Sequence, residues 1–167
     1  YGISAFVLAR QLGISNGEAK DYIDAYFVRY PGIRDYMNRA VEECRAKGFV
    51  ETLFGRRIHL PTIDDKNNAR KNYAERQAIN APIQGAAADI IKRAMIRVPA
   101  ALAKAKLQAR MLLQVHDELL FEAPTGQVDD TIAVVSEVMA GAAGPALELA
   151  VPLEVEAGVG ANWAEAH

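Results

Sequence analysis

The stretch MLLQVHDELLFE, residues 111–122, constrains the fold of this chain more than any other segment. Apolar residues flank the polar trio His116-Asp117-Glu118 on both sides. This pattern predicts two short antiparallel strands in the core, joined by a tight turn that carries the trio. Two adjacent carboxylates near a core are unfavourable, because like charges repel. The pair therefore indicates a site that holds a cation, and a divalent metal with oxygen ligands is the simplest candidate.

The composition is that of a globular chain, with 51% apolar and 24% charged residues in a length of 167. The apolar runs are far shorter than the ~18 residues that a membrane span needs, so we expect no membrane partner. The single cysteine, Cys44, cannot form an internal disulfide, which favours a reducing, cytoplasmic location. The chain begins at Tyr1, in residues typical of the middle of a helix. We therefore expect a fragment of a longer protein.

Charge is divided unevenly along the chain. Residues 1–110 hold all 19 Lys and Arg and 11 of the 21 acids, a formal charge of +8. Residues 111–167 hold the other ten acids and no Lys or Arg, a formal charge of −10. A basic segment of this kind favours a polyanionic partner, either a nucleic acid or a phosphate compound. An ordinary solvated surface with segregated charges is the alternative.

The order of elements predicts an α+β fold, with a helix-rich first half followed by part of an antiparallel sheet. Hydrophobic periodicity, together with Gly and Pro positions, predicts the boundaries. In the first half we expect helix over 17–47 with a break at 30–32, and a hairpin over 49–60 with a basic tip at Arg56-Arg57. A helix should begin at Ala69, be interrupted at Pro82 and Gly85, and continue in a new direction over 86–106. The remaining expected elements are a hairpin over 110–123, helix over 127–143 and a last strand over 151–157.

The acidic turn leaves several interpretations open. Adjacent residues in a strand point to opposite faces, so Asp117 and Glu118 share an ion only if the turn redirects one of them. We expect Asp117 to be the direct ligand and Glu118 a weaker one. A solvated turn, in which Asp is common, is the alternative. A His-Asp pair is also similar to that of metal-dependent phosphohydrolases, but these need more histidines, and only His59 and His167 remain.

A second candidate site is NYAERQAINAPIQG, residues 72–85. Arg76 and Asn80 are four residues apart and share a helix face, and Gln84 follows the break expected at Pro82. Arg, Asn and Gln are side chains that contact base edges and sugars. These three residues are therefore candidates for contact with the bases of a nucleic acid. An exposed polar face beside a capped helix break is the alternative.

Together these segments resemble the family A DNA polymerases, most closely the bacterial DNA polymerase I branch. The resemblance covers essentially the whole chain, and the combination of QVHDE with AERxAINxPxQG is very specific. A phage or organellar polymerase of the same family is a nearby alternative. The matching segments are Tyr1-Gly2 with the following SAFVLARQLGI, TLFGRRIHLP at 52–61, AERQAINAPIQGAAADIIKRAM at 74–95, QVHDELLFE at 114–122 and NW at 162–163.

The resemblance implies that the chain is the last part of a polymerase domain. Residues 1–68 would form the C-terminal part of the fingers subdomain, and residues 69–167 the C-terminal part of the palm. Asp117 would ligate the catalytic magnesium ions, Glu118 would be an auxiliary acid, and His116 would lie near the primer terminus. The nucleotide and DNA contacts implied are Tyr1 beside the nascent base pair, and Arg76, Asn80 and Gln84 in the minor groove of the primer-template.

The implied partners are primer-template DNA and a dNTP, and the implied reaction is attack of the primer 3′-hydroxyl on the α-phosphate. Two magnesium ions ~3.5–4 Å apart would assist it, as in the polymerases among two-metal enzymes. The family's other metal-binding aspartate, and the fingers Arg and Lys, precede the position of Tyr1. We therefore expect the isolated chain to be inactive, and to self-associate through apolar surface. A non-catalytic DNA-binding fragment and a phosphohydrolase remain the alternatives.

Overall fold

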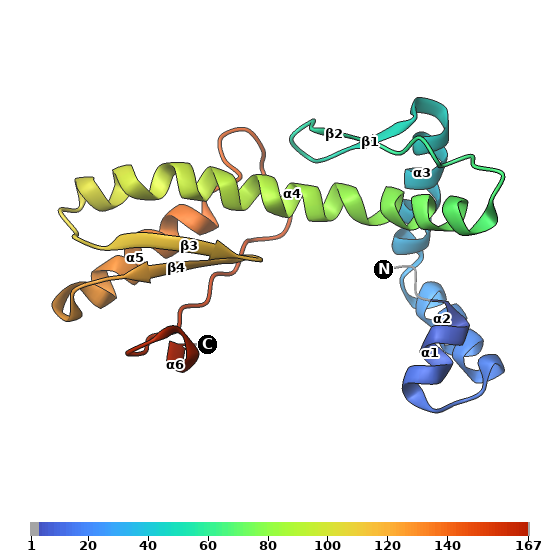
Figure 1. The fold of residues 1–167 in the computed structure, drawn as a ribbon, viewed down its shortest axis with the longest axis horizontal. Coiled ribbons are helices and arrows are strands. Elements are labelled where there is room, and N and C mark those ends of the chain that lie inside the picture. The colour runs from blue at the N-terminus through green and yellow to red at the C-terminus, as the bar shows by residue number, and fades with distance from the viewer. Residues whose placement is uncertain (1–3, 167) are drawn as a thin grey trace. The chain divides into compact units, whose positions relative to one another are not determined.

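The computed structural model describes residues 4–166 and confirms an α+β fold (Figure 1). The chain forms two compact units, one ending at Gly85 and one beginning at Ala86, and helix α4 contributes to both. The helices are α1 Ala5–Leu12, α2 Asn16–Arg29, α3 Pro31–Lys47, α4 Asn68–Lys104, the 3₁₀ turn η1 Thr125–Gln127, α5 Val128–Ala140 and α6 Trp163–Ala166. The strands are β1 Phe49–Glu51, β2 Arg57–His59, β3 Arg110–Val115 and β4 Glu118–Glu122.

Local sequence sets the helix ends in the first unit. Helix α2 begins with a capping box, in which Ser15 and Glu18 each bond to the other's backbone amide. Pro31 occupies the first turn of α3, where its missing N–H costs nothing. Gly13 and Gly48 end α1 and α3 in the left-handed region, with φ of 67° and 77°. The break between α2 and α3 and the end of α3 at Gly48 agree with those expected from the sequence.

The core of the first unit lies between α3, the β1–β2 hairpin and the first half of α4. The hairpin is antiparallel, with Val50 opposite Ile58, as the sequence predicts for residues 49–60. Its apolar side chains pack on α4, whose contribution to this core consists of small residues that allow close approach. The buried residues of this cluster are Cys44, Val50, Ile63, Ala74, Ala78 and Ala81.

Helix α4 is continuous over 37 residues (Figure 1), so the break expected at Pro82 and Gly85 is wrong. A proline inside a helix costs about 3 kcal/mol, because it removes a hydrogen bond and crowds the preceding turn. Burial of Ala78 and Ala81 in the core offsets this cost. Two tertiary hydrogen bonds, from Tyr36 in α3 and Arg56 in the hairpin, also reach α4 carbonyls in this region.

The second unit packs the end of α4 against the β3–β4 hairpin and α5. Val98, Leu102 and Val135 are buried together, and Phe121 of β4 packs against them. The two strands are antiparallel, as expected for residues 110–123, with an irregularity between Met111 and Leu113 where the register shifts. The hairpin therefore has one face on the apolar cluster formed by α4 and α5.

The turn after α5 departs from the prediction of helix up to residue 143. Helix α5 ends at Ala140, and the carbonyls of the following turn accept hydrogen bonds from two arginines of α4. Arg93 donates from Nε to the Ala142 carbonyl at 2.9 Å, and Arg97 donates from Nη2 to the Gly144 carbonyl at 2.5 Å. These guanidinium groups therefore satisfy carbonyls beyond the end of α5 that have no helical donor.

The last strand expected over residues 151–157 does not form. The alternation of Val151, Leu153 and Val155 is typical of a strand, but a strand also needs a hydrogen-bonded neighbour. Within residues 4–166, the sheet of the second unit consists of β3 and β4 alone.

Among the helices that the structure describes, none is long and apolar enough to cross a membrane.

Candidate functional site

The acidic trio lies at the β3–β4 turn, where the sequence places it. Val115 pairs with Glu118, so His116 and Asp117 form a two-residue connection. His116 has a φ of 51°, a left-handed conformation that costs an L-residue about 1–2 kcal/mol. The side-chain amide of Gln114 donates to the His116 carbonyl and holds the turn. Backbone strain of this kind is common where a turn presents functional side chains.

The expectation that the trio lies near the core is wrong, because His116, Asp117 and Glu118 are all exposed. The apolar residues beside them, Leu119 and Leu120, are half-buried. Repulsion between the two carboxylates is therefore screened by water rather than strengthened by a low-dielectric interior. Asp117 and Glu118 both line one hollow of the second unit.

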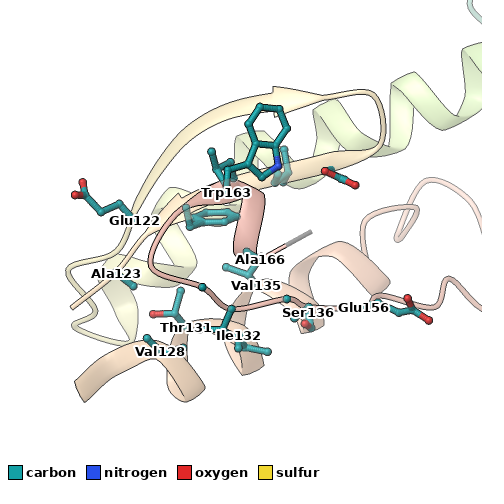
Figure 2. Close-up of a pocket in the computed structure, with 18 of the residues that line it drawn as sticks. Glu122, Ala123, Val128, Thr131, Ile132, Val135, Ser136, Glu156, Trp163 and Ala166 are labelled. Atoms are coloured by element: carbon teal, nitrogen blue, oxygen red, sulfur yellow. The ribbon is translucent and has the colours of Figure 1, made fainter. Parts of the chain in front are cut away.

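This hollow has a volume of about 1150 Å³ and lies between the hairpin, α5 and the residues that follow Glu154. Figure 2 shows its lining, with Val128, Thr131, Ile132 and Val135 on the α5 side. The residues that line it include five acids and no Lys or Arg, so its field is negative. The acids are Asp117, Glu118, Glu122, Glu154 and Glu156.

The chemistry of the acidic turn fits a hard cation, which takes carboxylate oxygens as ligands. Within residues 4–166, no cluster of three or more His, Cys, Asp or Glu side chains is arranged to hold a metal ion. Asp117 and Glu118 are thus a pair of adjacent candidate ligands, and not a closed metal site. His116 lies beside them in the turn, with its side chain exposed.

The second set of candidates lies on α4, in the unit that ends at Gly85. They are Arg76, Asn80 and Gln84, spaced four residues apart on one continuous helix. Together they form a row about 12 Å long, which we call the α4 row. Arg76 and Gln84 are exposed, and the guanidinium of Arg76 lies over the Tyr73 ring at 5.9 Å from its centroid. The row is longer than the sequence suggested, because α4 does not break before Gln84.

Asn80, at the centre of this row, is half-buried, and its side-chain oxygen, Oδ1, is buried without a hydrogen bond to any of the described residues. An unpaired buried acceptor is unfavourable by about 1–3 kcal/mol, and such atoms in folded proteins mark strain or a site completed by a ligand. Tyr1, the remaining DNA or nucleotide candidate, lies outside the described residues.

The sequence does not predict the residues of the β1–β2 hairpin that contact α4 beside this row. The tip of the β1–β2 hairpin contacts α4 at Gly85, through Thr52 and Arg56. The sequence places Arg56 at a basic hairpin tip and in the family-like segment 52–61, but predicts no contact with α4. The signal for this contact was Gly85 itself, since a glycine inside a helical pattern usually has a packing reason.

Comparison with known proteins places the chain in a family. The model of DNA polymerase family A matches residues 1–165. The DNA polymerase I of Rhizobium leguminosarum is 54% identical over 169 residues, which cover 100% of this chain and 17% of that protein. The DNA polymerase I of Pseudomonas aeruginosa is 54% identical over 167 residues, covering 100% of this chain and 18% of that protein.

A solved structure gives the same result. The POL domain of Pol1 from M. smegmatis, in complex with DNA primer-template and dNTP, superimposes with a TM-score of 0.92 at 49% identity. The match covers 99% of this chain and 29% of that one. The chain thus spans less than a fifth of the length of these curated relatives. With matches over essentially its whole length, the chain belongs to the family A DNA polymerases.

Proposed function

We propose that this chain is part of a DNA-directed DNA polymerase that acts in DNA replication and repair. The reaction is template-dependent transfer of a nucleotide from a dNTP to the primer 3′-hydroxyl. The observation that carries this proposal is the family match over residues 1–165, which includes the acidic turn. The complex of the M. smegmatis relative with primer-template and dNTP supports the same partners for this chain.

The acidic turn is the proposed metal-binding part of this polymerase. Magnesium, when bound, neutralises charge on the attacking and leaving oxygens of the phosphoryl transfer. Asp117 offers a direct carboxylate ligand, Glu118 acts as an auxiliary acid, and His116 lies near the primer terminus. All three residues are exposed, and Asp117 and Glu118 lie on an acid-lined hollow, which supports this assignment. We propose that the remaining ligands come from parts of the polymerase outside these 167 residues.

The α4 row is the proposed DNA contact. Every base pair presents acceptors at purine N3 and pyrimidine O2 in the minor groove, so the pattern there is nearly independent of sequence. Donors from Arg76, Asn80 and Gln84 can therefore test the shape of a base pair without preferring a sequence. Tyr1 is proposed to lie beside the nascent base pair.

We assign residues 1–68 to the C-terminal part of the fingers and residues 69–167 to the C-terminal part of the palm. The compact units divide elsewhere, at Gly85, within the helix that both share. The free, buried Cys44 is consistent with a cytoplasmic location. Membership of the polymerase family removes the basis for the phosphohydrolase alternative.

The test is primer extension by the full-length polymerase that contains this chain. Asp117→Ala should lower the rate of extension by at least about a thousandfold, while affinity for primer-template changes little. Asp129→Ala is the matched control, because Asp129 is an exposed acid of the same type in the first turn of α5. Near-normal extension by Asp117→Ala would exclude the proposed metal ligand.

A second function is proposed for the isolated chain, namely DNA binding without catalysis. The α4 row is complete within the described residues, whereas the acidic turn offers only a pair of adjacent ligands. The isolated chain therefore has the groups to contact primer-template, without a closed metal site of its own.

A further inference from the structure

The tip of the β1–β2 hairpin is a loop closed by hydrogen bonds to Thr52. The Thr52 Oγ1 accepts hydrogen bonds from the backbone amides of Phe54 and Arg56, at 3.3 and 3.2 Å. The Thr52 amide donates to the Arg56 carbonyl at 2.9 Å, and Gly55 supplies the positive φ of 81° that closes the turn. Thr52 is only 5% exposed, although it is polar. The position of Arg56 is therefore fixed by the loop itself.

This tip contacts α4 at Gly85, the residue after Gln84. A Cβ at position 85 would lie 2.6 Å from the Thr52 Cγ2 and 3.2 Å from an Arg56 guanidinium nitrogen. Thr52 is buried and β-branched, so its methyl group has little freedom to move away. Glycine is thus the residue that allows this approach. Arg56 Nη2 donates to the Gly85 carbonyl at 3.0 Å.

The same part of α4 has weak helical support of its own. Pro82 supplies no N–H, so the Ala78 carbonyl loses its helical donor. Gly85 adds backbone freedom in a helix interior, which costs about 0.5–1 kcal/mol relative to alanine. The bond from Arg56 to the Gly85 carbonyl therefore adds support to a part of the helix that has little of its own. Gln84 lies between these two residues and takes its position from them.

We propose that Arg56 is a positioning residue for Gln84. Its bond to the Gly85 carbonyl holds the C-terminal end of the α4 row, and so fixes where Gln84 meets the minor groove of the primer-template. The inference rests on the proposed polymerase function, and it assigns specificity to a hairpin that need not touch the DNA. Misplacement of a contact by about 1 Å is enough to cause large losses of rate.

The first test uses the full-length polymerase and compares extension of matched and mismatched primer termini. Arg56→Ala should lower kcat/KM on a matched terminus about tenfold, with a smaller loss on a mismatched terminus, so that discrimination falls. Arg57→Ala is the control. Arg57 pairs with Glu51 at 2.9 Å and lies over the Phe49 ring, so its loss should leave discrimination unchanged.

A double-mutant cycle separates positioning from direct contact. If Arg56 acts through Gln84, then Arg56→Ala should change discrimination little when Gln84→Ala is already present. Additive effects would show that Arg56 contacts the DNA by itself, and would overturn the inference. Thermal unfolding of each variant checks that lost discrimination does not follow from lost stability.

A second test disturbs the contact between the hairpin tip and α4 without changing Arg56. Gly85→Ala should displace the hairpin tip and lower discrimination as Arg56→Ala does. Adding Thr52→Ser removes the Cγ2 methyl group but keeps the hydroxyl that caps the loop, so the double variant should recover much of the loss. Failure of Gly85→Ala to alter discrimination in a folded enzyme would contradict the inference.

The two proposals fail in different ways. If the wild-type enzyme does not extend primers, or if Gln84→Ala has no effect on extension, the proposed function or its DNA contact is wrong. Suppose instead that the wild-type enzyme extends primers and that Gln84→Ala impairs extension. If Arg56→Ala then shows the same discrimination as Arg57→Ala, only the positioning role of Arg56 is wrong.

Discussion

The hydroxyl of Tyr36 in α3 donates a hydrogen bond of 2.8 Å to the carbonyl of Ile79 in α4. Ile79 precedes Asn80 and follows Ala78, the residue whose carbonyl loses its helical donor at Pro82. Helix α3 thus supports α4 at the centre of the proposed DNA-contact row. The bond joins residues 43 apart in the sequence, so no local pattern reveals it.

Tyr36→Phe should destabilise α4 locally by about 1 kcal/mol, because the Ile79 carbonyl loses a donor. Amides of α4 near Ile83 should then exchange roughly fivefold faster in the full-length polymerase, as measured by hydrogen exchange. Tyr22→Phe is the control, since Tyr22 is 62% exposed on α2. Equal exchange rates in the two variants would show that the bond contributes nothing.

Glu118→Gln should impair synthesis less than Asp117→Ala, because Glu118 is the proposed auxiliary acid. The magnesium concentration for half-maximal primer extension should rise severalfold, since the field at the hollow becomes less negative. Removing magnesium with EDTA should abolish extension by all variants. A magnesium titration of the full-length enzyme measures this. An unchanged midpoint would remove Glu118 from the metal site.

The isolated 167-residue chain should bind primer-template duplex without extending it. Its basic residues make this binding fall steeply with salt, so the slope of log K against log salt should be negative. Fluorescence anisotropy measures the binding, and incubation with dNTPs and magnesium tests for synthesis. Incorporation above background by this chain would contradict the proposal that further ligands are needed.

The isolated chain should also self-associate through apolar side chains that it exposes. Leu112 and Leu113 of β3 are 52% and 42% exposed and adjacent, which is unusual for a strand surface. Leu112→Ser with Leu113→Thr should shift light-scattering mass toward the monomer. Val28→Thr, at an 82% exposed position on α2, is the control and should leave the mass unchanged.

The Ser15–Glu18 capping box predicts a dependence on pH. Hydrogen bonds from the Ser15 hydroxyl and amide lower the pKa of Glu18 below its ordinary value of 4.5. Because the folded-state pKa is depressed, the stabilisation is present above the unfolded pKa and is lost as the pH falls through the folded one. A carboxyl titration by NMR should return the Glu18 pKa toward 4.5 in Ser15→Ala. An unchanged Glu18 pKa would mean that the cap does not form in solution.

Local rules predicted much of the fold and the position of the acidic trio at a hairpin turn. Pro31 and Gly48 bound α3, and the 110–123 segment forms the expected hairpin with the acidic trio at its turn. These features depend on residues close together in the sequence, so periodicity and turn chemistry are sufficient. The motifs at 74–95 and 114–122 likewise identified the family, which the comparisons confirm.

The predictions that failed were those that needed distant partners. Pro82 does not break α4, because the core, Tyr36 and Arg56 hold the helix together there. Residues 151–157 alternate as a strand but have no strand neighbour among the described residues, so no ladder forms.

The sequence by itself therefore determined the two hairpins, the boundary between α2 and α3, the end of α3 at Gly48, and the family. Only the tertiary structure decided that Arg76, Asn80 and Gln84 lie on one continuous helix, and that Asp117 and Glu118 are exposed on the same hollow. The physical reason is that a helix break or a buried charge depends on the balance between a local cost and long-range contacts. The sequence shows the local cost, whereas the contacts appear only when segments such as the hairpin tip and Gly85 are brought together.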